Sequence, residues 1–419
     1  MMSYMGVLME SVANGFRELR NVLSGNVLVM AISWFLYGLS GALVQPFFSL
    51  YAKSLGAGDL EIAVVKSIGM VVLGVFTVVG GLLTDRVGRV KMILAGTLLV
   101  SLTQFAYALV GSWSQLAVVW VIDEAAHFYQ PALTAIIMDS IPSRKELKGF
   151  IALNVFPSIP WLFMPVIGGR LYDIYGVQGI RYGFLVSGVL SLMVLLLRAR
   201  ALKETLTVAN RGGFNLVKDL TELFRFKMMK HVILIYLFTG FIAPLASSVW
   251  NTYGSIYSVR ILGVSNTEWG IVSTVGTASS IIASLILASV ISENYVAVMV
   301  TTSVLSAASY LFFASPTLMG VSPMTALVAG SVSGAIGGAL MGPVISAMLT
   351  RILPVELRGR AAGIQRFIEN MGWALASYIG GLLYVWLGAV GSLLASSVLS
   401  VAAFIYLYLV FRSLRTLLN

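Results

Sequence analysis

One helix-length apolar stretch, residues 115–138, carries three ionisable side chains, Asp123, Glu124 and His127. His127 follows Glu124 by three residues and Asp123 by four, so on a helix its ring can share a face with either carboxylate. Burial favours the neutral form of a carboxylic acid and so raises its pKa toward neutrality. A group that carries a proton at neutral pH requires such a shift. Neighbouring residues point about 100° apart on a helix. One carboxylate can therefore face a cavity while the other packs against another helix.

Two other interpretations of these side chains stay open. They could lie in water at one end of the helix and pair with Lys53, Arg170 or Arg181. Glu124 and His127 also have the spacing of half a di-iron helix motif, but that chemistry requires a second such pair, which this sequence lacks. Because the chain has no cysteine and only 2 histidines, we expect no metal site and no cofactor.

The overall composition places most of the chain in lipid. Of its 419 residues, 58% are hydrophobic and 11% charged, and the mean hydropathy is +0.92. A soluble protein carries about 25% charged residues. Apolar runs of about 20 residues predict membrane-spanning helices, because a helix satisfies its own backbone groups in lipid. The sequence thus predicts an all-α integral membrane protein.

Twelve apolar stretches follow one another along the chain. They are residues 27–50, 62–83, 92–111, 115–138, 150–169, 182–198, 231–257, 269–291, 295–314, 324–349, 364–387 and 389–411. We predict twelve transmembrane helices, divided into two six-helix halves at 26–198 and 231–419. A charged linker, 199–230, joins the halves, and residues 1–25 precede them as either a cytoplasmic surface helix or a frayed tail.

The Lys and Arg residues predict the orientation. Of the 27 Lys and Arg residues, 21 fall in segments that the twelve-helix arrangement puts on the same side of the membrane as both termini. Another 4 fall on the opposite side, and 2 lie within helices. Cytoplasmic segments carry such an excess, so both termini are expected in the cytoplasm of a cell whose plasma membrane the chain crosses many times. The same distribution explains the net charge of +10 without a nucleic-acid partner.

Aromatic and amide side chains in three of the stretches could line a pocket for an amphipathic solute. They are Tyr37 and Gln45 in the first, Gln130 in the fourth, and Trp250 and Asn251 in the seventh. The aromatic ones could instead belong to the belt of rings at the membrane surface. No arginine lies deep in the first, fourth, seventh or tenth stretch, which favours a cationic or neutral solute over an anionic one.

The two halves repeat a sequence pattern. Leu55-Gly56 and Glu61 recur 207 residues later as Leu262-Gly263 and Glu268. Further along, Ile167-Gly168-Gly169 and Gly176 recur 212 residues later as Ile379-Gly380-Gly381 and Gly388. Both offsets are near half the chain length, so the halves are expected to be parallel copies related by pseudo-symmetry, an arrangement suited to one half rocking against the other.

The short connection between the second and third stretches contains a charged motif. It reads Gly81-Leu82-Leu83-Thr84-Asp85-Arg86-Val87-Gly88-Arg89-Val90-Lys91. With the helix count and the repeat, this motif resembles the signature loop of the major facilitator superfamily, although Val90 replaces a frequent basic residue. Met164-Pro165-Val166-Ile167-Gly168-Gly169 is similar to a pattern of its antiporters, with methionine in place of the first glycine.

The resemblance implies a gating role for this motif. In the family, the aspartate at the position of Asp85 contacts the start of the eleventh helix and stabilises the outward-facing state. Arg366 and Glu369 are the expected partners there, and the resemblance extends the charge network over Gly81, Arg86, Gly88 and Arg89. A simple positive anchor with no gating role is the alternative.

Together these features predict a monomeric secondary transporter rather than an enzyme. The expected activity is proton-coupled efflux of small amphipathic or cationic compounds by alternating access, since the sequence has no phosphate-binding loop for ATP. An uptake symporter or uniporter for a neutral metabolite, such as a sugar or nucleoside, is the first alternative. A membrane-embedded enzyme or sensor with a transporter fold is the second.

Overall fold

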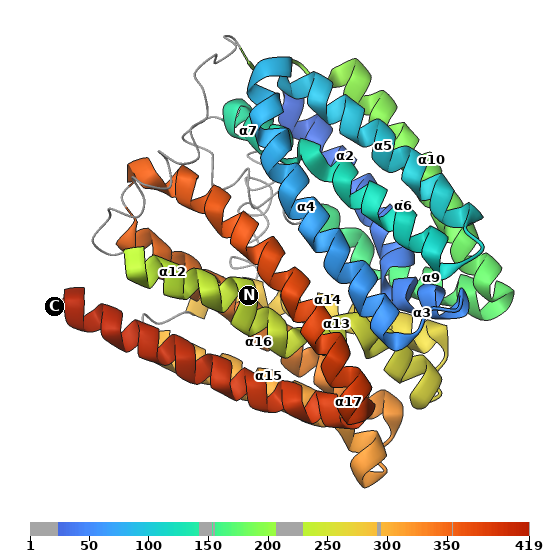
Figure 1. The fold of residues 1–419 in the computed structure, drawn as a ribbon, viewed down its shortest axis with the longest axis vertical. Helices are drawn as coiled ribbons and strands as arrows, with labels where there is room; N and C mark the ends of the chain where they lie inside the picture. Colours follow the sequence, from blue (N-terminus) through green and yellow to red (C-terminus); the bar gives the residue numbers. More distant parts are fainter. Residues whose placement is uncertain are drawn as a thin grey trace, which may run out of the picture.

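The computed structural model describes residues 24–141, 153, 156–206, 229–290, 295–353 and 355–418. Side chains at 85, 229, 287–290, 355–363 and 415–418 are outside this description. The predicted surface helix within 1–25 and most of the predicted linker 199–230 also lie outside the described residues. The regular structure of the described part is helical, as Figure 1 shows.

The first half of the chain forms one group of packed helices. Its elements are α2 (Gly25–Val44), η1 (Gln45–Phe47), α3 (Phe48–Ser54), α4 (Asp59–Val87), α5 (Arg89–Leu109), α6 (Trp113–Ala126), η2 (His127–Tyr129), α7 (Gln130–Ser140), η4 (Phe156–Leu162), α9 (Met164–Tyr175) and α10 (Val177–Ala201). Gly88 and Gly176, at φ 103° and 58°, separate α4 from α5 and α9 from α10. Glycine is favoured there because other residues are strained at positive φ.

The second half forms a second group. Its elements are α12 (Met229–Leu237), η5 (Phe238–Ile242), α13 (Ala243–Ile256), η6 (Tyr257–Ile261), α14 (Asn266–Val290), α15 (Tyr295–Met319), α16 (Pro323–Ile352) and α17 (Val355–Leu418). The η5 and η6 segments are π-helical turns that continue the helix on either side of α13. Gly388, at φ 68°, divides α17 into two helices.

Nine segments of the described chain are long and apolar enough to cross a membrane. One of the nine, 364–414, contains the break at Gly388 and therefore holds two helices. Two further segments, 113–140 and 156–175, are interrupted by 3₁₀ turns and are not among the nine. The predicted count of twelve follows if these two also cross the membrane.

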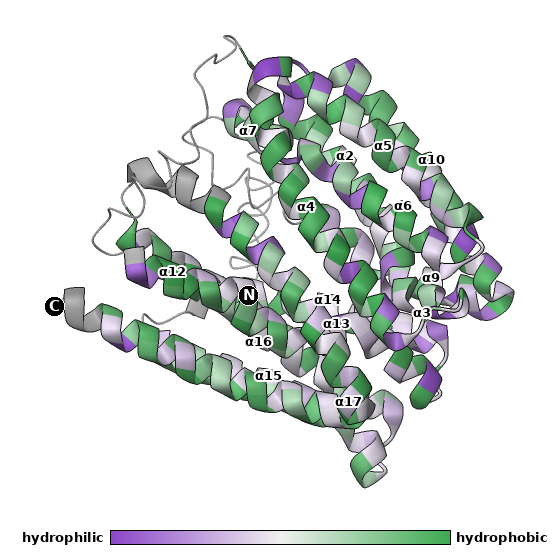
Figure 2. Cartoon of the chain, viewed as in Figure 1, coloured by the Kyte–Doolittle hydropathy of each residue, from purple (hydrophilic) through white to green (hydrophobic). Residues whose placement is uncertain are grey.

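The outward surfaces of the bundle are apolar. Leu109, Val118, Leu285 and Val398 expose 60% or more of their side chains, and Figure 2 shows hydrophobic residues along the outer faces of the helices. A water-soluble protein rarely exposes apolar surface on this scale, whereas lipid solvates it without loss. The hydrophobic residues that the sequence predicts to contact lipid therefore lie on the outward faces of the helices.

The internal repeat appears again in the tertiary contacts. The Tyr51 hydroxyl donates to the Tyr107 carbonyl oxygen at 2.8 Å, and 206 residues later the Tyr257 hydroxyl donates to the Phe313 carbonyl oxygen at 2.9 Å. Equivalent helices thus pack through equivalent atoms. The prediction of two pseudo-symmetric halves is confirmed.

The two halves meet extensively through α4 with α17 and through α9 with α14. We call the region of these contacts around α3, α9 and the start of α14 the closed end. In Figure 1 the two groups of helices approach each other there and diverge toward the ends that carry α7 and α12. The Trp269 indole N–H, on α14, donates to the Pro46 carbonyl oxygen at 2.9 Å, which ties one half to the other.

Paired glycines allow the halves to approach this closely. A Cβ atom added at Gly169 would overlap the carbonyl group of Asn266, and one added at Gly381 would overlap the side chain of Ala63. The two glycines are 212 residues apart, so each half presents the same small residue to the other. The backbone contact therefore depends on the absence of a side chain at both positions.

Substitution of Gly169 by alanine is expected to disfavour the closed end. Overpacking costs about 1–3 kcal/mol, so the population that is open there should rise by about tenfold. Because the chain lacks cysteine, a single Ala63→Cys substitution provides a label site that is buried when the halves meet. Maleimide should modify it faster in the Gly169→Ala background.

The matched control is Gly338→Ala, where an added methyl group meets open space. Equal labelling rates in the Gly169→Ala and Gly338→Ala backgrounds would show that the Gly169 contact does not hold the halves together.

Candidate functional site

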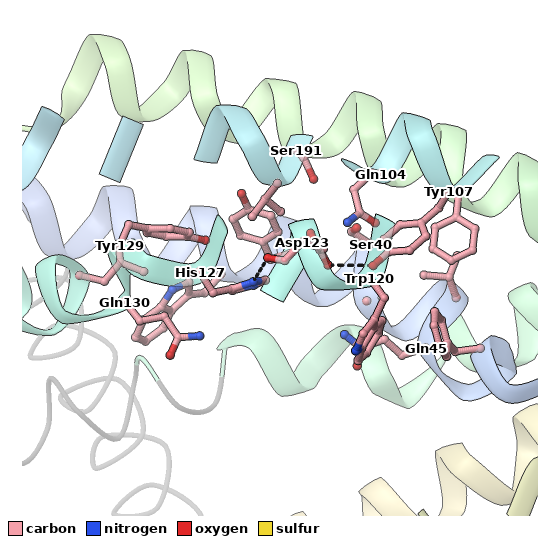
Figure 3. Close-up of a pocket in the computed structure, with 18 of the residues that line it drawn as sticks. Ser40, Gln45, Gln104, Tyr107, Trp120, Asp123, His127, Tyr129, Gln130 and Ser191 are labelled. Atoms are coloured by element: carbon pink, nitrogen blue, oxygen red, sulfur yellow. Dashed lines mark hydrogen bonds between the residues drawn. The ribbon is translucent and has the colours of Figure 1, made fainter. Parts of the chain in front are cut away.

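A cavity of about 450 Å³ lies within the first half of the bundle. Elements α2, η1, α3, α5, α6, η2, α7 and α10 supply its walls, and among the described residues Arg366 of α17 is the one lining residue that comes from the second half. Figure 3 shows the polar side chains that point into it. In the described part of the chain, the cavity therefore belongs mainly to the first half and meets the second half at Arg366.

The fourth membrane segment is broken where it lines the cavity. Pro131, the second residue of α7, has no N–H to give to the His127 carbonyl, so the helix passes through the 3₁₀ turn η2. The His127 Nδ1 lies 2.7 Å from the Asp123 carbonyl oxygen, and its ring stacks on Tyr129 at 6.0 Å between centroids. The break thereby places His127, Tyr129 and Gln130 in the cavity wall.

Asp123 lines the cavity and is held by two hydroxyl groups. Its Oδ1 lies 2.5 Å from Thr103 Oγ1, and its Oδ2 accepts from the Tyr107 hydroxyl at 3.3 Å. Figure 3 draws the contact with Tyr107. Thr103 Oγ1 is also 2.8 Å from the Val100 carbonyl oxygen. A hydroxyl has one proton, so if Thr103 gives it to Val100, its short contact with Asp123 requires a proton on the carboxyl group.

Glu124 is also buried but does not line this cavity. Its carboxyl group makes no hydrogen bond or ion pair with another described residue. Of the two adjacent acids, the structure thus brings only Asp123 together with His127 at the cavity, which the sequence left undecided.

The predicted substrate-binding residues divide into two sets. Tyr37, Gln45 and Gln130 line the cavity. Trp250 instead stacks on Phe313, with ring centroids 3.5 Å apart. Asn251 is exposed, and its carbonyl oxygen accepts from Lys66 Nζ at 3.0 Å across the two halves. A role in substrate binding stays a prediction for all five.

The charged motif surrounds the sharp turn between α4 and α5. Gly88 makes this turn, and Arg89 forms an ion pair with Asp139 of α7 and donates to Thr205 Oγ1 at 2.7 Å. Arg86 is exposed. A Cβ atom added at Gly80 of α4 would overlap the Phe128 carbonyl, whereas a Cβ atom at the predicted Gly81 would make only ordinary contact with Pro131.

The predicted partners on α17 are placed only in part. The Asp85 side chain is outside the described residues, so its contact with the eleventh helix stays a prediction. Arg366 lines the cavity, and Glu369 accepts from Gln365 Nε2 at 2.8 Å on its own helix.

An acid that no sequence pattern singled out caps the motif. Glu204, just after α10, accepts from the Val90 N–H at the start of α5 at 3.0 Å, and from the Thr205 and Leu206 N–H groups. Partial burial would raise the pKa of Glu204, but these backbone hydrogen bonds outweigh it and lower that pKa below its usual value. Only the fold brings Glu204 to Val90, 114 residues away.

A second unpredicted acid ties the halves at the closed end. The Asp173 carboxylate, on α9, accepts from the backbone and side chains of Asn266 and Thr267 at the start of α14. A carboxylate at a helix N-terminus is stabilised by the unpaired N–H groups there. The repeat places Val385 at the equivalent position in the second half, so this cap exists on one side only.

Metal-binding chemistry has no candidate in this part of the chain. Within residues 24–141, 153, 156–206, 229–290, 295–353 and 355–418, no three histidine or acidic side chains gather closely enough to hold a metal ion. The cavity offers hydrogen-bonding side chains, aromatic rings, the buried acid Asp123, and the basic side chains of His127 and Arg366.

Two similar helical halves joined at one end, with a polar cavity in the wall of the first half, have the architecture of a secondary transporter. The model of the Major Facilitator Superfamily matches residues 30–316 and 238–417. The chain therefore belongs to this family, which confirms the resemblance in the sequence. It is a membrane transport protein for a small molecule rather than an enzyme.

Two curated relatives are drug-resistance proteins. The multi-drug resistance efflux pump PmrA of Streptococcus pneumoniae is 25% identical over 182 residues, 42% of this chain and 45% of that protein. The quinolone resistance protein NorA of Staphylococcus aureus is 22% identical over 255 residues, 61% of this chain and 64% of that protein. The matches thus span less than two thirds of either relative.

Solved structures share the fold at low identity. The peptide transporter POT in complex with sulfate aligns with a TM-score of 0.74 and 14% identity over 92% of this chain and 94% of that one. The nucleoside transporter NupG gives 0.72 and 14% over 93% and 99%. The human organic anion transporter MFSD10 gives 0.67 and 17% over 93% and 99%.

Replacement of Glu204 by glutamine is expected to lower stability at neutral pH but not at acid pH. The folded-state pKa is lowered, so the stabilisation is present above the unfolded-state pKa and is lost as the pH falls through the folded-state value. Because Glu204 is exposed to solvent, we expect less than about 1 kcal/mol.

Thermal unfolding of both proteins in the same detergent, at pH 7 and below pH 4, measures this difference. Lys203→Gln is the control for loss of a neighbouring charge. A gap in Tm between the wild type and Glu204→Gln that stays the same at both pH values would contradict the role of the carboxylate.

Proposed function

We propose that this protein is a proton-coupled exporter of small amphipathic compounds that works by alternating access. The observation that carries the proposal is the buried Asp123 carboxyl group at the wall of an aromatic and amide-lined cavity. An ionisable group within a membrane bundle is energetically expensive and therefore a candidate for function. The efflux activity in the name of PmrA supports the direction of transport.

The surroundings of Asp123 suit a group that gains and loses a proton. Thr103 and Tyr107 hydroxyls can donate to the charged carboxylate, and Thr103 can turn to Val100 when the carboxyl group carries a proton of its own. Each protonation state thus has a hydrogen-bond arrangement, and neither leaves Asp123 Oδ1 without a partner. His127, four residues away, lines the same cavity and offers a second proton acceptor.

The aromatic and amide groups of the cavity suit a planar, partly polar solute. Trp34, Tyr37 and Trp120 provide apolar faces, and Gln45, Gln104 and Gln130 provide hydrogen-bond donors and acceptors. Such a mixture fixes orientation by a few polar contacts while most of the solute is desolvated.

The inter-half contacts support the way in which the cavity would change sides. Asp173 and Trp269 tie the halves at the closed end, so opening there requires those contacts to break while the other end closes. In this proposal, both termini and the charged motif are cytoplasmic, the protein crosses the plasma membrane as a monomer, and Asp85 pairs with the start of the eleventh helix when the cytoplasmic end closes. The halves are 26–198 and 231–419, joined by a linker at 199–230.

An uptake symporter for a neutral polar solute is the second candidate. The three glutamines of the cavity favour it, because amides recognise hydroxyl and carbonyl groups without charge. The direction of proton movement separates the two candidates.

The test uses the full chain in liposomes that hold a pH-sensitive dye, with an acidic interior. Addition of a cationic amphipathic dye outside should provoke proton exit in the wild type. Asp123→Asn should reduce this coupled exit by tenfold or more, because an amide cannot carry the proton, while binding of the dye is retained.

Glu124→Gln is the matched control, since it neutralises the adjacent buried acid that does not line the cavity. It should keep most of the coupled flux. Coupling that survives in Asp123→Asn would remove Asp123 from the proton path. Proton entry together with a sugar or nucleoside, with the gradient reversed, would favour the symporter.

A further inference from the structure

Gly69 lies directly behind one aromatic wall of the cavity. It belongs to α4, a helix that contributes no lining residue in the described part of the chain. A Cβ atom added at Gly69 would overlap the indole ring of Trp120, and its three nearest atoms all belong to that ring. Trp120, on α6, lines the cavity, as Figure 3 shows. The lack of a side chain at Gly69 therefore lets the ring lie against the backbone of α4.

No hydrogen bond fixes the Trp120 ring in this position. The ring atom nearest to an added Cβ at Gly69 is the indole nitrogen, Nε1. Among the described residues, this buried N–H has no hydrogen-bond partner, although a buried indole N–H usually finds one. The position of the ring therefore depends on steric contact with Gly69.

The second half holds α4 on the side away from Trp120. Ala63 and Gly74 of α4 lie against Gly381 and Met371 of α17. At about 100° per residue, both positions on α4 are more than 100° round the helix from Gly69. While the halves are in contact, α4 cannot retreat from a larger side chain at Gly69. The added volume must displace the Trp120 ring toward the cavity.

Trp120 stands next to the buried acid of the cavity. It precedes Asp123 by three residues on α6, so the ring and the carboxyl group share one side of the helix. The ring also packs on Phe48, with centroids 4.5 Å apart, and Phe48 lines the same cavity. A solute that is both aromatic and cationic can place its charge near Asp123 and its ring against Trp120.

A second aromatic wall has the same kind of support. A Cβ atom added at Gly96, on α5, would overlap the Tyr129 ring, and the guanidinium carbon of Arg198 is 5.8 Å from the centre of that ring. The sequence groups Arg198 with the cytoplasmic charges, but it is fully buried and its Nε contacts Ser33 Oγ at 3.3 Å inside the bundle. Groups outside the lining thus position both rings.

The internal repeat retains the glycine without the ring. Gly276, 207 residues after Gly69, is the counterpart of Gly69 in the second half. A Cβ atom added at Gly276 would make an ordinary contact with Ser331 at 3.7 Å. The second half therefore has room for a methyl group at this position, whereas the half that contains the cavity does not.

We propose that Gly69 is a positioning residue that selects solutes by size. Without a side chain, it keeps the Trp120 ring back from the cavity, and the cavity then admits a planar cation of several fused aromatic rings. Gly69 acts through Trp120 and does not touch the solute itself. The inference rests on the proposed function, because it takes this cavity as the site where the solute binds.

The test is a binding titration of the full chain in lipid nanodiscs with two fluorescent cations, N-methylacridinium and N-methylquinolinium. Both are planar and permanently charged, and they differ by one fused ring. The wild type should bind the larger cation more tightly. Gly69→Ala should weaken the larger cation by about tenfold and the smaller one by less than about threefold, because the displaced ring overfills a close-packed site.

Two further variants separate the position of the ring from helix packing. Gly276→Ala is the matched control and should leave both affinities unchanged, because the added methyl group has room. Trp120→Phe, introduced into the Gly69→Ala protein, removes the indole edge that the methyl group would meet and should restore the preference for the larger cation. This double variant should also fold if Gly69→Ala alone does not.

Several results would overturn the proposal. They are a wild type that binds neither cation or prefers the smaller one, equal weakening of both cations or of neither in Gly69→Ala, and the same size effect in Gly276→Ala. A double variant that fails to fold or to regain the preference would show that Gly69 serves the packing of the helices alone.

The outcome is independent of the transport test, because binding requires neither a proton gradient nor flux. Coupled proton exit that depends on Asp123, with an unchanged size preference in Gly69→Ala, would leave the exporter and remove the role of Gly69. A size preference that depends on Gly69, without coupled proton movement, would leave that role and remove the proton-coupled exporter.

Discussion

The lack of water in the membrane core is the constraint on which this structure depends. Each backbone N–H and C=O there must find a partner within the protein, and continuous helices satisfy that requirement segment by segment. The fourth segment departs from it at η2, because Pro131 cannot donate to the carbonyl of His127. The departure is tolerated where the segment lines a cavity, and it is there that His127, Tyr129 and Gln130 gather.

The same constraint governs the contact between the halves. Two rigid helical units can meet closely only where side chains are absent, and Gly169 and Gly381 provide that absence at equivalent positions. Polar contacts are then added at the rim, where Asp173 caps α14 across the interface. A contact built from small residues and a few hydrogen bonds holds one end together and can also be broken, which is the requirement for alternating access.

Pseudo-symmetry of the backbone does not extend to the chemistry. The repeated Tyr51 and Tyr257 hydrogen bonds show that the halves share a fold, yet nearly all of the cavity wall belongs to the first half. The buried acid, the buried Arg198 and the unpartnered Ser191 are there too. Arg366 is the contribution of the second half to the cavity, so movement of one half against the other would move a charge relative to the bound solute.

The sequence by itself determined the lipid environment, the helices, the repeat and the charged motif, because hydropathy, glycine spacing and charge are properties of local sequence. It also singled out Asp123, Glu124 and His127, since an ionised group in an apolar stretch is conspicuous on its own. Only the tertiary structure decided that Asp123 lines the cavity and Glu124 does not, that Glu204 caps α5, and that Arg198 points inward. Those choices depend on helix rotation and on contacts between residues as much as 165 positions apart, such as Ser33 and Arg198. Local sequence patterns do not encode such contacts, because burial and partners are set by how the helices pack.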